Sequence, residues 1–445
     1  MMSTTKIIVL DDDPTGSQTV HGCLLLTSWD VDTLREALLD ASPLFFVLTN
    51  TRGMSAERAK AVTREVCVNI RQALDALEQH GQRINPLLVS RSDSTLRGHY
   101  PVETDVIAET LGPFDAHFMV PAFFEGGRFT RDSVHYLITD GQPIPVHETE
   151  FARDSIFGYQ HSYLPDYVEE KTAGRIRADQ VERFTLADVR GDVSARLLGL
   201  HDNVCCVVDA EAQTDLDHFA AQLLQAATEG KRFLFRSAAS LLTALAALPP
   251  QPVRPEEMAT YVRNGRPGAV IVGSHVKKTT QQLGQLLRIP GVAEMEVDVD
   301  RIAGERDALL TDILERCHQA HADGLTPVIF TSRVERAFAD QAARLAFGEQ
   351  VSAFLMDIVR GLPVTLGFLI SKGGITSNDV LSSGLALRIS RVLGQILPGC
   401  SVVRCPDEHP RYPGLPVVIF PGNVGDEHAL ATAYTRLATT QAISR

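Results

Sequence analysis

The sequence predicts an α/β protein of two domains, each with a mainly parallel sheet flanked by helices. Short β-branched runs recur along the chain, each followed by small or polar residues and then by helical spacing, as in strands joined by crossover helices. At 445 residues the chain is too long for one ordinary core, because domains usually hold about 100–200 residues. The Pro-rich segment 248–255 can continue neither a helix nor a central strand. We therefore expect domains at 1–250 and 251–445.

The predicted strands occur in both halves of the chain. They are 6–10, 44–49, 86–89, 117–120, 204–208 and 233–235, then 269–272, 327–331, 364–370 and 417–420. After Ser377, apolar residues from Val380 to Ile396 recur at helical spacing, which predicts one buried helix. Most of the strands run into polar residues, and ligands of open α/β sheets bind beyond the carboxyl ends of the strands. The active site is therefore expected in the cleft between the two domains.

Composition and charge exclude several classes of function. Lys+Arg 42 against Asp+Glu 55 gives a net charge of -13, so the chain lacks the excess of positive charge that binds nucleic acid or an anionic membrane. The seven cysteines are scattered without metal-ligand spacing, and the fourteen histidines form no ligand grouping and are expected to face solvent for the most part. No run reaches the roughly 20 apolar residues of a membrane span, and no signal-peptide core is present. These features predict a cytoplasmic protein.

The polar run 90–99 has the groups that a phosphoryl acceptor of acidic character needs. Arg91 and Arg97 could pair with a carboxylate, Ser92 and Ser94 could bond hydroxyls, and Asp93 could take the hydroxyl proton. A surface loop in which Ser92 or Asp93 caps a helix is the structural alternative.

Two further groups follow earlier strands. Asp12 lies in the run 11–16, where carboxylates could bond acceptor hydroxyls or approach Mg²⁺, although a capped turn would use the same residues. Arg52 follows the second strand and is either a carboxylate partner or a solvated arginine.

Three small-residue loops follow strands of the second half. They are 273–274, 371–377 and 421–425, and their glycines would let backbone N–H groups approach phosphate oxygens, with Lys372 adding a charge. Each loop alone is better explained as a tight turn, but together they indicate a nucleotide site. Neither the P-loop nor the common dinucleotide fingerprint is present.

The motifs resemble those of the four-carbon acid sugar kinase family, which contains erythronate, threonate and 3-oxo-tetronate kinases. The resemblance spans nearly the whole chain, and its most specific motif is Asp93-Ser94-Thr95-Leu96-Arg97-Gly98. The other matching segments are 12–16, 148–154, 273–274, 373–376 and 422–426.

The resemblance implies a sugar-acid-binding first domain and a nucleotide-binding second domain, with ATP and Mg²⁺ as cosubstrate and metal. It implies acceptor ligands at Asp12, Arg52, Arg91, Ser92, Asp93 and Ser94. The chemistry of the loop adds Arg97 to this set and makes Asp93 and Asp12 the catalytic candidates. It implies ATP contacts at Ser274, Lys372, Gly373, Gly374, Ile375 and Gly422, and the chemistry of the same loops adds Thr376, Asn423 and Gly425. The metal ligands stay unknown, and a homodimer is a candidate assembly.

The chain departs from the family pattern at several positions. Pro14 stands where Phe is common, Arg91 where Lys is common, and Phe420-Pro421 where the family usually has Lys-Ser. The expected function is an ATP-dependent kinase of carbohydrate metabolism that phosphorylates a terminal hydroxyl of a small sugar acid such as 3-oxo-tetronate, erythronate or threonate. The alternatives are a kinase of a branched acid such as 3-oxo-isoapionate, a non-catalytic sugar-acid sensor, and a nucleotide-using dehydrogenase or synthetase on the same architecture.

Overall fold

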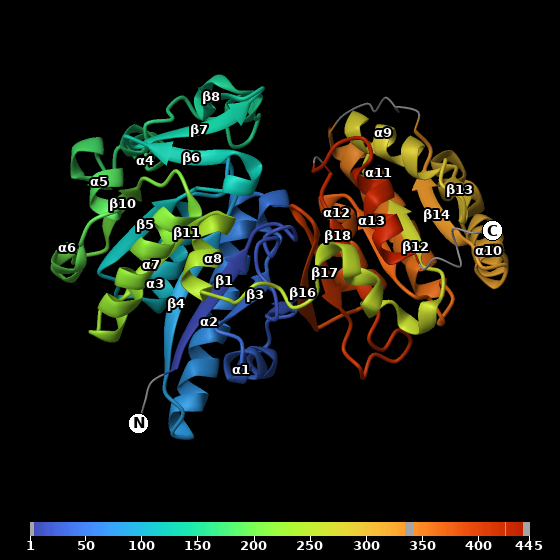
Figure 1. The fold of residues 1–445 in the computed structure, drawn as a ribbon, viewed down its shortest axis with the longest axis horizontal. Coiled ribbons are helices and arrows are strands. Elements are labelled where there is room, and N and C mark those ends of the chain that lie inside the picture. Colours follow the sequence, from blue (N-terminus) through green and yellow to red (C-terminus); the bar gives the residue numbers. More distant parts are fainter. Residues whose placement is uncertain (1–3, 334–340, 423, 439–445) are drawn as a thin grey trace. The chain divides into compact units, whose positions relative to one another are not determined.

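The computed structural model describes residues 4–333, 341–422 and 424–438. The chain divides into two compact units, Met1–Pro249 and Pro250–Arg445, and each is described by itself. Figure 1 shows that each unit holds its own strands with helices around them.

Unit 1 is built on an eight-stranded sheet whose neighbouring strands are all parallel, in the order β2-β3-β1-β4-β11-β5-β10-β9. Its strands are β1 Thr4–Asp11, β2 Leu24–Leu26, β3 Leu44–Leu48, β4 Ile84–Arg91, β5 Ala116–Val120, β9 Glu182–Phe184, β10 Val204–Val208 and β11 Phe233–Ser237. The chain passes from β1 to β3 on one side and then to β4 on the other, so the strand order reverses at β1. Ligands of such sheets bind at this kind of reversal.

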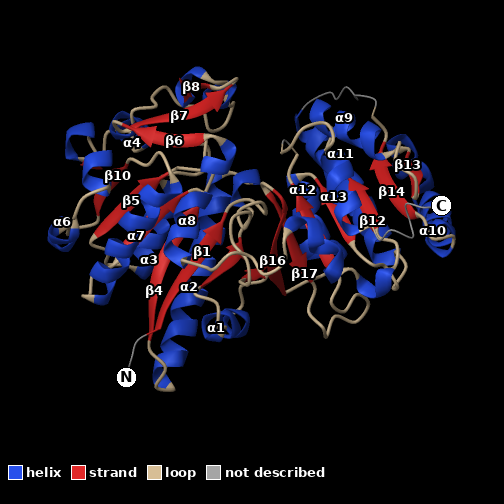
Figure 2. Cartoon of the chain, viewed as in Figure 1, coloured by secondary structure: helices blue, strands red, loops and turns tan. Residues whose placement is uncertain are grey.

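Helices flank the sheet of unit 1, as Figure 2 shows. They are α1 Val31–Leu39, α2 Ala56–Gln79, α3 Val102–Leu111, α4 Leu164–Lys171, α5 Leu186–Val189, α6 Ser194–Gly199, α7 Gln213–Thr228 and α8 Ala239–Ala246. α2 packs against α1 and α3, and α7 packs against α6 and α8. Most of the strands between them are buried along most of their length, as expected where helices cover a parallel sheet.

A small antiparallel sheet is inserted after β5. It consists of β6 Arg128–Arg131, β7 Val134–Thr139 and β8 Gln142–Pro145, with Thr130 opposite His135 and Arg128 opposite Leu137. Leu137 shares a hydrophobic cluster with Leu96, which follows β4. This cluster attaches the small sheet to the loop that leaves β4.

Unit 2 has a mixed sheet in the order β13-β14-β12-β15-β18-β17-β16. Its strands are β12 Ala269–Val272, β13 Val292–Val297, β14 Thr326–Thr331, β15 Leu369–Lys372, β16 Ile389–Leu397, β17 Cys400–Arg404 and β18 Pro416–Phe420. The five strands β13, β14, β12, β15 and β18 are each parallel to their neighbours, while β17 is antiparallel to both β18 and β16. The helices are α9 Lys277–Leu286, α10 Ile302–Ala322, α11 Gln341–Gly361, α12 Gly374–Asp379 and α13 Ala429–Leu437.

The single buried helix predicted from Val380 to Ile396 is wrong. The helix α12 continues only into a π-helical turn at Val380–Gly384, and β16 begins at Ile389. Burial alternates along most of β16, which is the period of a strand and not of a helix, and Pro398-Gly399 forms its turn to β17. β-branched Ile389, Val392 and Ile396 fit both patterns, so their spacing alone misled the prediction.

The other predicted strands are present with small changes at their ends. The exception is 364–370, where only the last two residues are in strand and β15 continues to Lys372. Among the described residues, no helix is long and apolar enough to cross a membrane.

Candidate functional site

The loops that leave β3, β1 and β4 meet because these strands are neighbours. Asp11 pairs in register with Leu48 on one side and Arg91 on the other. Beyond the strands, the N–H of Thr49 donates to the carbonyl of Asp11 (2.9 Å) and the N–H of Asp12 donates to that of Arg91 (3.3 Å). The predicted acceptor residues of three separate segments therefore lie at one edge of the sheet.

Asp12 and Arg52 form the centre of this cluster. Nε of Arg52 donates to Oδ2 of Asp12 (3.1 Å) and Nη2 donates to Oδ1 (2.5 Å), while the hydroxyl of Ser92 also donates to Oδ2 (2.7 Å). Nη1 of Arg52 lies 3.5 Å from Asp13 and 3.9 Å from Asp93. Burial opposes the charge, but Asp12 and these other carboxylates raise the pKa of Arg52 well above its usual value. Arg52 is thus a fixed cation that joins two predicted acceptor loops.

Arg91 and Asp11 form a second, buried pair. Nη1 of Arg91 lies 3.2 Å from Oδ1 of Asp11 and 3.7 Å from Oδ1 of Asp12. Oδ2 of Asp11 and Nε of Arg91 are buried without a hydrogen-bond partner. Burial raises the pKa of Asp11 to about 7, against the opposing effect of Arg91. Gly16 allows this arrangement, because a Cβ there would clash with the Asp11 carboxylate.

Asp93 is held as a carboxylate by cations on both sides. Nε of Arg97 donates to its Oδ2 (2.9 Å), Thr95 Oγ1 donates to the same oxygen, and Arg52 lies 3.9 Å from Oδ1. Burial acts to raise the pKa of Asp93, but Arg52, Arg97 and Thr95 outweigh it and hold the pKa well below the usual value. Asp93 is therefore ionised at neutral pH and can accept a hydrogen bond from a hydroxyl.

Glu103, on α3, was not anticipated from the sequence. Its carboxyl accepts hydrogen bonds from Thr51 Oγ1 (2.5 Å) and Ser90 Oγ (3.4 Å) and is buried beneath the cluster. Burial, together with the nearby charge of Asp12, raises its pKa to about 7. Its position between Val102 and Thr104, in the first turn of a helix, gives no sequence signal that separates it from an exposed glutamate.

Buried side chains hold the backbone of the loop 93–98, and every carbonyl from Asp93 to Arg97 accepts a hydrogen bond from one of them. The pairs are Arg236 Nη1 to Asp93 O (3.2 Å), His135 Nε2 to Ser94 O (2.8 Å), Tyr159 Oη to Thr95 O (2.7 Å), Tyr167 Oη to Leu96 O (2.6 Å) and Arg236 Nη2 to Arg97 O (2.9 Å). Leu96 and Gly98 have φ of 67° and 117°, so the loop keeps a shape that few residues adopt freely.

The donors to this loop come from two strands, one helix and a second loop. Arg236 is on β11 and is 1% exposed, which makes it one of the largest fully buried side chains. Most of the histidines are not buried, as expected, but His135 is buried, and burial lowers its pKa to about 4. His99, His117 and His321 are buried as well. In the sequence, Arg236 could have been noticed as a charged residue near the end of an apolar strand. Nothing in the local sequence marks Tyr159 or Tyr167 as part of the site.

The structure thus brings six of the seven predicted acceptor residues into contact through their side chains. Asp12, Arg52, Arg91, Ser92, Asp93 and Arg97 form one hydrogen-bonded and ion-paired cluster. Ser94 belongs to the same loop and is held there through its carbonyl. Arg97 also lies 3.6 Å from Asp154 and stacks on Phe151, which places part of the 148–154 motif beside the cluster.

In unit 2, the predicted nucleotide loops follow β12, β15 and β18, which are adjacent strands. The hydroxyl of Thr279 lies 3.1 Å from that of Ser274 and 3.3 Å from the carbonyl of Gly422, which ties the first loop to the third. Gly273 is required at this junction, because a Cβ there would clash with Thr376. The three loops therefore converge at the carboxyl ends of their strands.

Lys372 is fully buried, and its ammonium group donates to the carbonyls of Pro421 (2.5 Å) and Gly422 (3.1 Å) while lying over the ring of Phe420. Burial lowers its pKa to about 7. Lys372 thus holds the loop that follows β18 by hydrogen bonds to the main chain of Pro421 and Gly422.

The remaining predicted nucleotide residues lie in the same loops. Gly373, with φ of 121°, and Gly374 begin α12, Thr376 is buried within it, and the side chain of Ile375 is 73% exposed. Gly425, with φ of 78°, follows Val424, whose carbonyl accepts from Gln282. Asn423 lies outside the described residues.

Across the described parts of the chain, no group of three or more His, Cys, Asp or Glu side chains is arranged to hold a metal ion. Mg²⁺ in kinases is usually bound through substrate phosphates and only one or two carboxylates. The structure therefore identifies no metal ligands, and a metal that arrives with a nucleotide needs no preformed cage. The convergent glycine loops, in contrast, fit a phosphate group.

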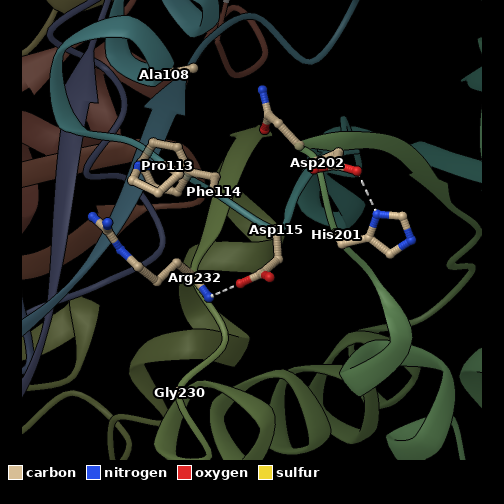
Figure 3. A pocket seen from close by; sticks show the side chains of 9 residues that line it. Ala108, Pro113, Phe114, Asp115, His201, Asp202, Gly230 and Arg232 are labelled. Carbon is tan, nitrogen blue, oxygen red and sulfur yellow. Dashed lines mark hydrogen bonds and ion pairs between the residues drawn. The ribbon is translucent and has the colours of Figure 1, made fainter.

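A cavity of about 440 Å³ lies elsewhere in unit 1. Figure 3 shows its lining residues Phe114, Asp115, His201 and Arg232, which directly precede or lie just before β5, β10 and β11. This is the amino-terminal end of these parallel strands, opposite to the edge that carries the cluster. Asp115 is already bonded to the N–H of Arg232 (2.8 Å). The cavity is therefore separate from the candidate site.

Comparisons with known proteins agree with this division of the chain. Residues 7–245 match the model of a sugar-binding N-terminal domain, and residues 269–430 match that of a nucleotide-binding C-terminal domain. D-erythronate kinase of Heliobacterium modesticaldum is 24% identical over 461 aligned positions, which cover 98% of both chains.

Two solved structures have the same fold. A protein of Salmonella typhimurium LT2, named as a candidate tRNA synthase, is 19% identical with a TM-score of 0.67 and is matched over 96% of this chain and 98% of its own. A Haemophilus influenzae protein of the DUF1537 family is 16% identical with a TM-score of 0.63, over 97% of this chain and 100% of its own. At these identities the structures establish the fold and not the activity.

Proposed function

The chain belongs to the four-carbon acid sugar kinase family, and we propose that it is an ATP-dependent kinase that phosphorylates a terminal hydroxyl of a small sugar acid such as erythronate. The observation that carries the proposal is the cluster around Asp12, Arg52 and Asp93. This cluster lies where the strand order of the unit 1 sheet reverses. The residues of that sheet fall within the match to a sugar-binding domain.

The cluster suits a polyhydroxylated ligand because its charged side chains are already held by one another in fixed positions. Hydroxyl groups of a sugar acid can donate to the carboxylates of Asp12 and Asp93 and accept from the guanidinium group of Arg52. The two carboxylates are separated in sequence, but both contact Arg52, so their spacing is set before a ligand arrives. Such preorganisation lowers the entropy cost of orienting the acceptor.

Asp93 is the proposed partner of the reacting hydroxyl. Its low pKa makes it a weak base, but phosphoryl transfer through a loose transition state needs little proton abstraction before the phosphorus–oxygen bond forms. Asp93 would orient the hydroxyl and accept its proton late. Asp12, bonded to Ser92 and Arg52, is the alternative candidate for this role.

The nucleotide is assigned to the loops after β12, β15 and β18. Backbone N–H groups near Gly373 and Gly422 would approach the phosphates, and Ser274 and Thr376 would add hydroxyl donors. Mg²⁺ bound to the nucleotide would neutralise charge that develops on the transferred phosphoryl group. Because Lys372 is engaged by two carbonyls, we assign it to shaping the third loop. The closure of two domains over the substrates stays a prediction.

ADP release during incubation with ATP, Mg²⁺ and a panel of linear and branched sugar acids tests the activity. The expected result is acid-dependent ADP formation and a phosphorylated acid detected by mass spectrometry. Binding of an acid without ADP formation would refute the kinase and favour the sensor.

Asp93→Asn tests the role of the carboxylate. We expect a fall in kcat of about 10²–10⁴-fold, the usual contribution of a positioned acid or base, with nearly unchanged nucleotide binding. The matched control is Asp154→Asn, since Asp154 pairs with the same Arg97 but lacks the bond to Thr95 and the contact with Arg52. An active Asp93→Asn enzyme would move the assignment to Asp12.

A further inference from the structure

A sugar acid carries a carboxylate, and the arginines predicted to bind it are already paired with protein carboxylates. Arg52 is bonded to Asp12, Arg91 lies against Asp11, and Arg97 is bonded to Asp93. A ligand carboxylate placed on any of them would also meet the negative charge of its protein partner. The cluster is therefore better suited to hydroxyl groups than to an additional anion.

Arg128 differs from these arginines. Among the residues that the structure describes, no carboxylate forms an ion pair or hydrogen bond with its guanidinium group, and its Nε is buried without a partner. Burial lowers the pKa of Arg128, although the pKa stays far above neutrality for a guanidinium. A cation of this kind gains much from an anionic partner, because burial has removed part of its hydration.

The register of the small sheet points Arg128 toward the loop 93–98. Thr130 lies opposite His135 and bonds to its ring, and the same ring donates to the carbonyl of Ser94. Arg128 is two residues before Thr130 on β6, so both side chains leave the same face of the strand. Leu137, opposite Arg128, belongs to the cluster that contains Leu96.

Phe123 and Gly126 form the immediate surroundings of the Arg128 guanidinium group. The group lies over the ring of Phe123 at 5.9 Å, and it occupies space next to Gly126, where a Cβ would clash with Nη1. The charges of Asp93 and Arg97 both act on Arg128, which places it within electrostatic range of the proposed reacting carboxylate. Arg128 is thus a partly buried cation within electrostatic range of the acceptor loop.

We propose that Arg128 binds the carboxylate of the sugar acid and thereby selects acids over uncharged polyols. The inference rests on the proposed function of the site, and it adds a specificity-determining residue from the small antiparallel sheet. The acceptor would then lie with its carboxylate at Arg128 and its hydroxyls toward Asp93 and Asp12.

The test compares the binding of D-erythronate and of its uncharged amide, measured by calorimetry without nucleotide. For Arg128→Met we expect acid affinity to fall about 10- to 100-fold, the loss typical of a hydrogen bond to a charged group, with little change for the amide. Arg128→Lys keeps the charge without the planar fork and should restore part of the acid affinity. Thermal unfolding of each variant reports whether the small sheet is intact.

Arg131→Met is the matched control, because Arg131 is on the same strand but is half exposed and paired with Glu211. It should bind the acid as the parent protein does. Unchanged acid affinity in Arg128→Met, or an equal loss for acid and amide, would overturn the inference. Acid binding without ADP release would refute only the kinase activity, whereas a parent protein that binds no sugar acid would overturn both.

Discussion

The buried carboxyl of Glu103 makes a sharp prediction about the pH dependence of stability. Its pKa is raised from 4.5 to about 7 in the folded protein, because the site removes it from water close to Asp12. A raised pKa means that the folded state holds the proton more tightly than the unfolded state. The resulting stabilisation is complete below the unfolded pKa, about 4.5, and is lost as the pH rises to about 7.

The size of this effect follows from the difference between the two pKa values. A rise from 4.5 to about 7 corresponds to about 3 kcal/mol of unfolding free energy lost across that range. Glu103→Gln removes the titration but keeps an oxygen that can accept from Thr51. We therefore expect the variant to gain stability relative to the parent as the pH rises from 5 to 8, by ~2 kcal/mol.

Urea unfolding followed by tryptophan fluorescence measures this in the appropriate part of the chain. The only tryptophan, Trp29, lies in unit 1 and is fixed by contacts with Glu65 and Asn69 of α2. Glu109→Gln is the control, because Glu109 is on the same helix as Glu103 but is exposed and paired with Arg64. Unfolding free energies of Glu103→Gln and parent that run parallel between pH 5 and 8 would refute the reasoning.

Two other changes test the loops. Gly98→Ala should abolish sugar-acid binding while nucleotide binding persists, because Gly98 has φ of 117° and a Cβ there would clash with Ser92. Full binding of the acid, measured by calorimetry, would contradict this. Lys372→Met should weaken binding of an ATP analogue about 10-fold or more and leave acid binding intact, because the variant loses the bonds to Pro421 and Gly422. Unchanged nucleotide affinity would show that the third loop keeps its shape without this lysine.

The strands that carry the site could be predicted because parallel strands in a covered sheet are continuous apolar runs. β1, β3, β4 and β12 are buried along most of their length, and the polar residues that follow each were the signal for a site. The sequence could not show that β1 lies between β3 and β4, on which the meeting of Asp12, Arg52 and Asp93 depends.

The parts that were missed depend on contacts between distant segments. Tyr159, Tyr167 and His135 serve the site by bonding carbonyls of the loop 93–98, and nothing in their local sequence distinguishes them from other core aromatics. The strand β16 was mistaken for a helix because Ile389, Val392 and Ile396 satisfy helical spacing, whereas its pairing with β17 sets its conformation. Local periodicity reveals neither hydrogen bonds between distant segments nor the pairing of strands.

The anchoring of the loop 93–98 through its carbonyls has a consequence for how such a site can change over evolution. Tyr159, Tyr167, His135 and Arg236 bond to the main chain, so they support the same loop shape whatever side chains the anchored residues carry. A substitution at Ser94 would alter the groups offered to a ligand while leaving the position of the loop unchanged. Substrate preference could then diverge between relatives by single replacements, without rebuilding the scaffold that presents them.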